Sequence, residues 1–382
     1  MLVFGWGLYL ASSWTWCIGM FLPILLLRWW GWPGFLAFAV PNVLGCALFG
    51  YVLTPETSRA FSSRFAAWIA VFGGATIAYQ AGFLVAAGMP VALLIATPAA
   101  AMALALPPRA VAARDRVLML AGVVAWVASC ALFSRIGTDP LADLPARGTL
   151  PPASLAWAAP FMATGFLLCP YLDPTFHLAL QRSPSRHCFG VFGVGFAIML
   201  LFTAGFHDPT TGGADLGGPM LWGRSIVLWQ WGGQAAFTVV AVAAALRSLR
   251  DGEGVVLPRV SAAVIALSLV SIAALRSIEG LLPAMADGLL PATGPVPGEP
   301  TYLRWLGLYG VVFPAAVLLG LRRIPWPVQA AAIVTAGILA EMGMIGARMP
   351  LLGASVAVLL IAALWPAAPI RATAEIAPTE SR

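Results

Sequence analysis

The recurrence of long apolar segments is the feature of this sequence that most limits what it folds into. Runs of about 20 mostly apolar residues, the length of a helix that crosses a bilayer, follow one another between breaks made by Arg, Pro or Gly. Only 9% of the 382 residues are charged and 60% are hydrophobic, and a soluble core of this size does not bury that much apolar surface. The sequence therefore predicts an all-α integral membrane protein that partners the lipid bilayer.

The expected membrane spans cover nearly the whole chain and number about twelve. They are 3–27, 33–53, 65–87, 89–106, 117–134, 154–172, 188–206, 222–247, 259–281, 302–321, 326–346 and 350–367. We expect a single transmembrane domain over 1–366 and a disordered polar tail over 367–382. No expected loop is long enough to hold a separate soluble catalytic domain.

Arginine supplies every positive side chain, and its distribution over the loops predicts the orientation. With the spans above, fourteen of the 21 arginines fall on one side of the membrane and seven on the other. Cytoplasmic loops are enriched in positive charge, so we expect both termini in the cytoplasm of a multi-pass protein of the cell inner (plasma) membrane. The net charge of +6 comes from these thinly spread arginines, and nucleic acid is excluded as a partner.

Two of the expected spans are interrupted by polar residues and prolines. The first carries a hydroxyl-rich run at 12–17 with Pro23 further on, and the sixth carries Pro160 and the run 170–174, in which two prolines flank an acid. Proline removes a backbone hydrogen bond from a helix, and no water replaces that bond in the bilayer core. Both spans are therefore predicted to be broken helices whose freed backbone groups face something polar.

The order of the two interrupted spans, first and sixth, predicts an internal symmetry. An interval of five helices inverts the second set of five relative to the first, and secondary transporters enclose a midplane site between interrupted helices of two inverted halves. We expect a first repeat over about 1–135, a second over about 150–322 and two trailing C-terminal helices over about 325–366.

This layout resembles the LeuT-type (amino acid–polyamine–cation) transporter fold, and within it the sodium:solute symporter family. The run 11–16, followed by Gly31-Trp32, is similar to the broken polar first core helix of that family and the turn after it. The run 173–177 is similar to the acid–aromatic–polar pattern after its sixth core helix, with Leu178 where an arginine is expected. The resemblance implies a 5+5 inverted-repeat, LeuT-like core that moves a small solute by alternating access.

The residues for ion coupling are less well defined. Sodium-coupled members of the family place adjacent hydroxyls on the eighth core helix, whereas the eighth span here offers only Ser225 and Thr238. The coupling ion is therefore Na⁺, H⁺ or none. Asp173 and His177 are candidates for ion coupling or proton transfer, since they lie one helical turn apart. The alternatives are an anchoring role for Asp173 at the membrane interface and a structural hydrogen bond for His177.

Candidate solute-binding residues are the polar or small residues at membrane depth. They are Ser12, Ser13, Thr15, Tyr79, Gln80, Thr164, Gly165, Trp229, Gln230 and Gln234. The hydroxyls of the first span either line a site or bond the preceding turn of their own helix, and Tyr79 and Gln80 either face a cavity or join two helices. Gln230 and Gln234, one turn apart, should point inward because an unsatisfied amide in lipid is costly.

No catalytic residue, metal site or further cofactor is expected. The five cysteines form no C-x-x-C pair and no Cys/His cluster with metal-ligand spacing, and no G-x-x-x-x-G-K loop indicates ATP binding.

Two other functions are compatible with the sequence. A membrane enzyme of lipid-linked glycosyl or acyl transfer would need acids and histidine converging at one face. The expected external loops supply Asp139, Asp143, His207, Asp208 and Asp215. A non-transporting LeuT-fold receptor or complex subunit would keep the broken helices without solute flux, with a membrane-protein partner or in a homo-oligomer.

Overall fold

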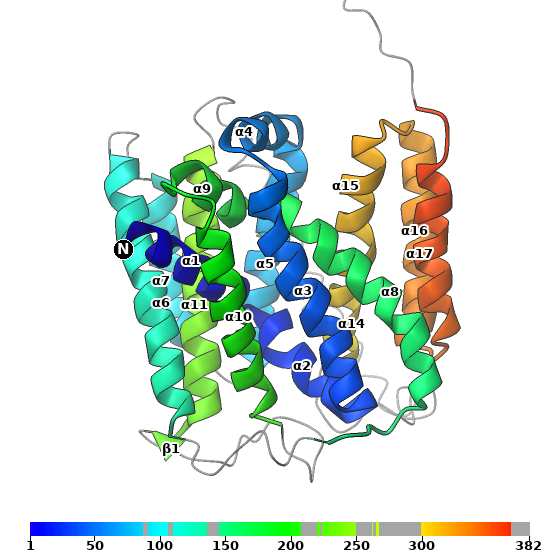
Figure 1. Ribbon diagram of the computed structural model, residues 1–382, viewed down its shortest axis with the longest axis horizontal. Coiled ribbons are helices and arrows are strands. Elements are labelled where there is room, and N and C mark those ends of the chain that lie inside the picture. The colour runs from blue at the N-terminus through cyan, green and yellow to red at the C-terminus, as the bar shows by residue number, and fades with distance from the viewer. Residues whose placement is uncertain are drawn as a thin grey trace, which may run out of the picture.

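Long apolar helices form the architecture of the computed structural model (Figure 1). The structure describes residues 1–86, 91–105, 110–135, 145–207, 220–221, 224–249, 262, 265–266 and 299–367. Within these ranges, seven helices are long and apolar enough to cross a membrane, and a bent pair of shorter helices makes an eighth span. The chain is therefore an all-α, multi-span membrane protein, as expected from the sequence.

Helices occupy every expected span except 259–281, which lies almost wholly outside the described residues. They are α1 (Leu2–Trp14) and α2 (Cys17–Trp30) in the first span, then α3 (Trp32–Val52), α5 (Ala66–Ala86), α6 (Val91–Ala105), α7 (Val111–Phe133), α8 (Pro152–Leu168), α10 (Cys188–Ala204), α11 (Ile226–Ser248), α14 (Glu299–Gly307), α15 (Phe313–Leu321), α16 (Trp326–Met344) and α17 (Pro350–Ala363). A π-helical turn, Leu308–Val312, joins α14 to α15. Two short strands, β1 (Met220–Leu221) and β2 (Arg224–Ser225), pair just before α11.

Two short helices lie between the expected membrane spans. They are α4 (Pro55–Arg64) and α9 (Pro174–Arg182). Each begins with proline after a capping residue: the Thr54 hydroxyl accepts from a backbone N–H at the start of α4, and the Asp173 carboxylate does so at the start of α9. A capping side chain and a proline at the first helical position both favour a helix start. The two helices pack against each other at one end of the bundle (Figure 1).

Both interrupted spans break where polar residues were noted, and neither breaks at its other proline. The axis bends by 62° between α1 and α2, whereas α2 continues through Pro23. Similarly, α8 continues through Pro160 and then tightens into a 3₁₀ turn, Cys169–Leu172, before Asp173. Neighbouring helices compensate for a proline inside a membrane helix, so the prolines alone did not locate the breaks.

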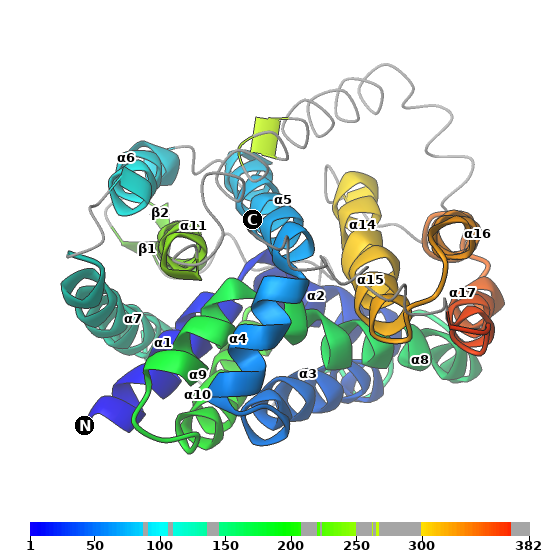
Figure 2. The same ribbon diagram turned by 90° about the horizontal axis from the view of Figure 1, so that it is seen from above.

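The helices pack in pairs from opposite parts of the chain. α1 packs against α7 and α10, while α8 packs against α3 and against the π-turn and α15. α3 also packs against α10, and α5 against α11. Viewed from above, α16 and α17 stand together at one side, next to α8 (Figure 2).

The segment 145–150, before α8, is hydrogen-bonded to the corner between α2 and α3. The Thr149 and Leu150 N–H groups donate to the carbonyls of Arg28 and Trp29, at 2.9 and 2.7 Å, and the Trp32 N–H donates to the Pro145 carbonyl at 3.0 Å. The last carbonyls of a helix have no partner within the helix. The bonds from Thr149 and Leu150 therefore satisfy two such carbonyls at the C-terminal end of α2. We call residues 145–150 the strap.

Gly31 at this corner is expected to tolerate no side chain. Its φ is +66°, and an added Cβ would lie 2.5 Å from the Pro145 carbonyl oxygen of the strap. We therefore expect Gly31→Ala to reduce the stability of the purified protein by about 1–3 kcal/mol, measured as a lower thermal midpoint in detergent. Gly233→Ala is the control, because no atom of the described residues lies within 4 Å of its added Cβ. Equal midpoints for the two variants would contradict this.

Candidate functional site

The break between α1 and α2 receives hydrogen bonds from three other spans. The Thr238 hydroxyl of α11 shares its one proton between the Ser13 carbonyl at 3.2 Å and the Gln234 carbonyl of its own helix at 3.0 Å. The Cys17 N–H donates to Gln80 Oε1 of α5 at 2.7 Å, and the Tyr302 hydroxyl of α14 donates to the Cys17 carbonyl at 3.1 Å. Backbone groups freed by the bend are thus satisfied by side chains from elsewhere, as an interior without water requires.

The start of α9 meets this break. The Ser13 hydroxyl lies 3.3 Å from the Thr175 hydroxyl, and the rings of Trp14 and Phe176 are 5.0 Å apart. Asp173 accepts hydrogen bonds from the Thr175 N–H and hydroxyl, both at 2.6 Å. The structure therefore makes Asp173 a helix cap located where the two interrupted segments approach each other.

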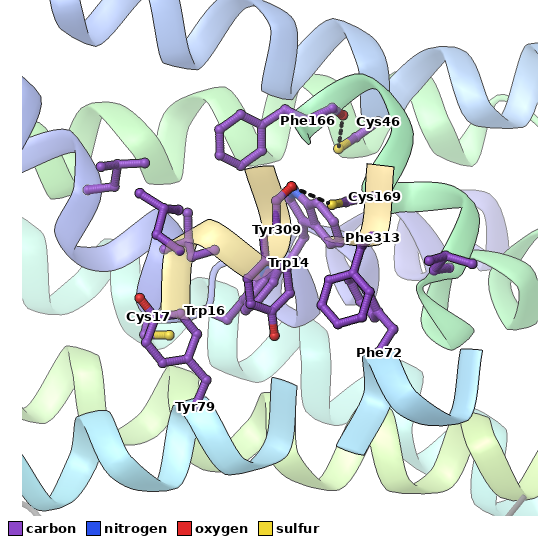
Figure 3. Packing of buried hydrophobic residues seen from close by; sticks show 14 of the residues in the cluster. Trp14, Trp16, Cys17, Cys46, Phe72, Tyr79, Phe166, Cys169, Tyr309 and Phe313 are labelled. Carbon is purple, nitrogen blue, oxygen red and sulfur yellow. Dashed lines mark hydrogen bonds between the residues drawn. The ribbon is translucent and has the colours of Figure 1, made fainter. Parts of the chain in front are cut away.

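Aromatic rings fill the space around the break (Figure 3). Trp16, at the bend itself, is 2% exposed, and its ring centroid lies 5.3 Å from that of Trp14, 6.1 Å from Phe72 and 4.7 Å from Tyr309. A small apolar cavity lies beside this cluster, between α8 and the π-turn. The centre of the molecule is therefore closely packed.

The four predicted hydroxyl residues fall into two groups. Ser12 donates to the Gly122 carbonyl of α7 at 2.8 Å, and Ser13 contacts α9 and its own helix. Thr15 and Thr164 instead donate to carbonyls four residues back in their own helices, at 2.7 and 2.8 Å. Of these four hydroxyls, Ser12 and Ser13 therefore link the interrupted spans to other elements in the described part of the chain.

Three further candidates have separate surroundings. The Tyr79 hydroxyl donates to the Tyr302 carbonyl at 2.8 Å, which joins α5 to α14. Gly165 lets α8 approach the π-turn, since an added Cβ would lie 2.8 Å from a carbonyl oxygen there. The Trp229 indole donates to a β1 carbonyl at 2.8 Å. Tyr79 thus borders the break, Gly165 lies beside the apolar cavity, and Trp229 points toward the short strands.

His177 holds α4 against α9. Its Nε2 lies 2.9 Å from the Tyr171 carbonyl and its Nδ1 lies 2.8 Å from the Ser58 hydroxyl, to which Gln181 also donates at 3.0 Å. Because a carbonyl only accepts, Nε2 carries a proton, and Nδ1 is then free to accept from Ser58 in the neutral ring. The ring nitrogens are thus engaged by Ser58 and Tyr171 and not by Asp173.

Several amide and indole groups near the break have no partner in the described part of the chain. They are Nε2 of Gln80, both side-chain polar atoms of Gln230, Nε1 of Trp231 and Oε1 of Gln234. All four side chains are at most 4% exposed. The Nε2 of Gln234 donates to Ser129 Oγ of α7 at 2.6 Å. The two predicted glutamines of α11 therefore do point inward.

A buried ion pair closes the end of the molecule that carries the strap. Arg28 Nη2 of α2 lies 2.5 Å from Glu299 Oε1 of α14. The two side chains are 7% and 0% exposed, so neither charge is solvated by bulk water. Such a pair is costly to break from one side only, because the remaining charge stays buried.

A second charged network lies at the opposite end, where Arg114 and Asp115 are buried and Arg182 is 42% exposed. Arg114 Nη2 of α7 lies 2.6 Å from Asp115 Oδ1 and also bonds the Ser248 hydroxyl of α11, while Arg182 Nε of α9 lies 3.4 Å from Asp115 Oδ2. The sequence placed Arg114 and Asp115 in a loop before a span at 117–134. The helix starts at Val111 instead, because this network neutralises their charges inside the protein.

Some contributors to the site were not singled out from the sequence. Tyr302, Thr175 and Trp231 are ordinary residues of their segments, and their roles depend on which helices meet. Of the acids and the histidine expected to converge at the external face, His207 lies within the described residues. Asp139, Asp143, Asp208 and Asp215 lie outside them.

The chain matches no protein-family model, no curated protein and no solved structure in the comparisons made. Its class rests on the structure itself, which is that of an all-α, multi-span membrane protein. Within the described residues, its central polar contacts gather at the bend of the first span.

We expect Gln80→Met to destabilise the break. Methionine has nearly the same shape but no strong acceptor, so the buried Cys17 N–H loses its partner, at a cost of about 1–3 kcal/mol. A lower thermal midpoint of the purified protein would show this. Thr164→Val is the control, since within the described ranges the Thr164 hydroxyl bonds its own helix and should matter by less than about 1 kcal/mol. A Gln80→Met midpoint no lower than that of Thr164→Val would be inconsistent with the role of Gln80.

Proposed function

We propose that this chain is a secondary-transporter-like protein of the inner (plasma) membrane, which moves a small solute by alternating access around its two interrupted spans. The observation that carries the proposal is the bend between α1 and α2, where backbone groups of Ser13 and Cys17 are bonded by side chains from α5, α11 and α14. Transporter sites are typically built at such discontinuous helices.

The packing pairs support a LeuT-like arrangement of inverted repeats. Suppose that the first span corresponds to α8 with α9, α3 to α10, α5 to α11 and α7 to the α14–α15 span. When equivalent helices are exchanged, the helix–helix contacts given next are converted into one another. The pairing of α1 with α10 corresponds to that of α8 with α3, and the pairing of α1 with α7 to that of α8 with α15. The pairs α3–α10 and α5–α11 map onto themselves. This exchange is what a pseudo-twofold axis in the membrane plane would generate.

The ion pairs at the two ends supply the proposed gates. The Arg28–Glu299 pair links α2 to α14 at one end, and Asp115 links α7 and α9 at the other. The closure of both ends and the filling of the centre by rings support an occluded state in the proposed cycle. Opening one end at a time requires one network to break while the other stays intact.

Charge supports the proposed orientation. The α4–α9 end carries Arg59, Arg64, Arg114 and Arg182, and the excess of arginine expected on that side supports a cytoplasmic location for it. The strap and the Arg28–Glu299 pair are then external, and both termini are cytoplasmic.

A non-transporting receptor or complex subunit of the same fold is the second candidate. The close packing of Trp16 against Trp14, Phe72 and Tyr309 favours it, since a ring fixed at the bend leaves a solute no space. In that case the polar contacts at the break are structural, and the gates never open.

Sided labelling of Cys17 tests the transport proposal. Cys17 is fully buried at the break, and the other four cysteines are first replaced by alanine. Removing one partner of a buried charge pair costs about 3–5 kcal/mol, which biases the closed state toward opening at that end. We therefore expect Glu299→Gln to increase labelling by a membrane-impermeant maleimide at least about tenfold in intact cells. Asp115→Asn should do the same in inverted membrane vesicles.

Glu56→Gln is the matched control, because the exposed Glu56–Arg59 pair is worth only about 0–1 kcal/mol. Its labelling should equal that of the parent protein from both sides. Labelling that stays absent in both gate variants would favour the non-transporting subunit. Repeating the assay with Na⁺ replaced by a large organic cation, and at two pH values, distinguishes coupling to Na⁺ from coupling to H⁺.

A further inference from the structure

Four side chains next to the break, which are wholly or partly unpaired, form what we call the amide cluster: Gln80, Gln230, Trp231 and Gln234. All are at least nine-tenths buried, and each carries at least one polar atom without a hydrogen-bond partner in the described ranges. Buried polar groups in native proteins are nearly always bonded, so exceptions require an explanation. An unpaired group is especially costly where lipid and apolar side chains replace water.

The cluster occupies one region, where α11 meets α2, α5 and α7. The Trp231 ring packs against Phe21 of α2 and Phe83 of α5, at centroid distances of 6.1 and 5.1 Å. Gln80 lies one turn from Phe83 on α5 and bonds Cys17, which lies one turn from Phe21 on α2. Gln80 and Trp231 therefore border the same first turns of α2.

The two glutamines of α11 extend this region toward α7. Gln230 and Gln234 are one turn apart on α11, and Gln234 donates to Ser129 on α7. Thr238, one further turn along, bonds the Ser13 carbonyl. One side of α11 therefore carries buried polar groups along three successive turns, and these turns reach from α7 to the bent span.

The chemistry of the free atoms defines what they would bind. The unpaired donors are the N–H groups of Gln80, Gln230 and Trp231, and the unpaired acceptors are the carbonyl oxygens of Gln230 and Gln234. We infer that the amide cluster binds an uncharged solute with a carboxamide, lactam or urea group, whose oxygen accepts from the donors and whose N–H groups donate to the acceptors. This inference rests on the proposed transport function and names the solute class.

Charged solutes fit the cluster poorly. A carboxylate only accepts, so it would leave the carbonyl oxygens of Gln230 and Gln234 unpaired and face them with like charge. An ammonium group only donates and would leave the free N–H groups unpaired. A buried site made to hydrogen-bond one group discriminates strongly against an analogue that leaves its polar atoms unpaired.

The cluster is also connected to the part of the molecule that would move. Gln80 holds the Cys17 N–H through its oxygen and leaves its nitrogen free. A solute bonded to that nitrogen therefore contacts the residue that fixes the start of α2. Tilting of α2 about the bend would open space beside Gln80 and Trp231.

The first test needs no solute. If the Gln230 amide is unpaired, Gln230→Leu removes a buried polar group with little change in volume and should raise the thermal midpoint of the purified protein by at least about 2 °C. The matched control is Gln329→Leu, because the Gln329 amide donates to the Ile324 carbonyl at 2.7 Å and its loss should lower the midpoint or leave it unchanged. A lower midpoint for Gln230→Leu would overturn the inference.

The second test uses paired probes in a thermal-shift assay of the purified protein. Nicotinamide and uracil carry the inferred groups, and nicotinate and orotate are their carboxylate counterparts. We expect at least one uncharged probe to raise the midpoint of the parent protein while its counterpart does not. This effect should be lost in Gln230→Leu and in Trp231→Phe, which removes only the indole N–H donor, and kept in Gln329→Leu. If no uncharged probe acts, or if the carboxylates act equally, the inference is wrong.

The labelling and thermal-shift assays give different results for a wrong solute site and for a protein that does not transport. Binding of an uncharged probe through Gln230 without any opening of Cys17 to labelling would retain the site and exclude transport. Opening of Cys17 in both gate variants, with probe effects unchanged by Gln230→Leu and Trp231→Phe, would retain transport and exclude the amide cluster as its solute site.

Discussion

Hydrogen bonding of the backbone at the bend of the first span determines how the surrounding helices are placed. Inside an apolar bundle no water is present to bond the carbonyl of Ser13 or the N–H and carbonyl of Cys17. Thr238, Gln80 and Tyr302 supply these bonds, which brings α11, α5 and α14 to one point. Polar residues are therefore concentrated at this point, while the outer faces of the helices are apolar.

Buried charged side chains are few in the part of the chain that is described, and four of them form two pairs of opposite charge. The Arg28–Glu299 and Arg114–Asp115 pairs are buried near opposite ends of the bundle. The first pair joins α2 to α14, and the second joins α7 to α9 through Arg182 and to α11 through Ser248. Hydrophobic contact alone holds membrane helices together weakly, because lipid is as apolar as the helices. These pairs, with the backbone bonds of the strap, add specific contacts that apolar side chains do not provide.

The sequence predicted the helical spans and the two interruptions because both depend on local composition. Runs of apolar residues determine the spans, and Ser12 to Cys17 marked the first bend. Helices α4 and α9 were missed because they have only ten and nine residues, too few to cross a membrane, and lie between the long apolar runs from which the spans were predicted. The start of α7 was missed because Arg114 and Asp115 look like loop residues until their partners are known. The inward direction of Gln230 and Gln234 was predicted, but the partners of Gln80 depend on tertiary packing.

The π-turn at Leu308–Val312 changes the direction in which residues after it point from the axis of their span. A single extra residue in a helix of 3.6 residues per turn rotates everything after it by about 100° relative to a regular helix. On one side of this insertion, Glu299 is directed to Arg28, and on the other, the Gly320 carbonyl is directed to Arg64 at the end of α4. The rotational offset thus lets one continuous span bond both α2 and α4. Within the irregular turn, the Cys169 thiol donates to the Tyr309 carbonyl.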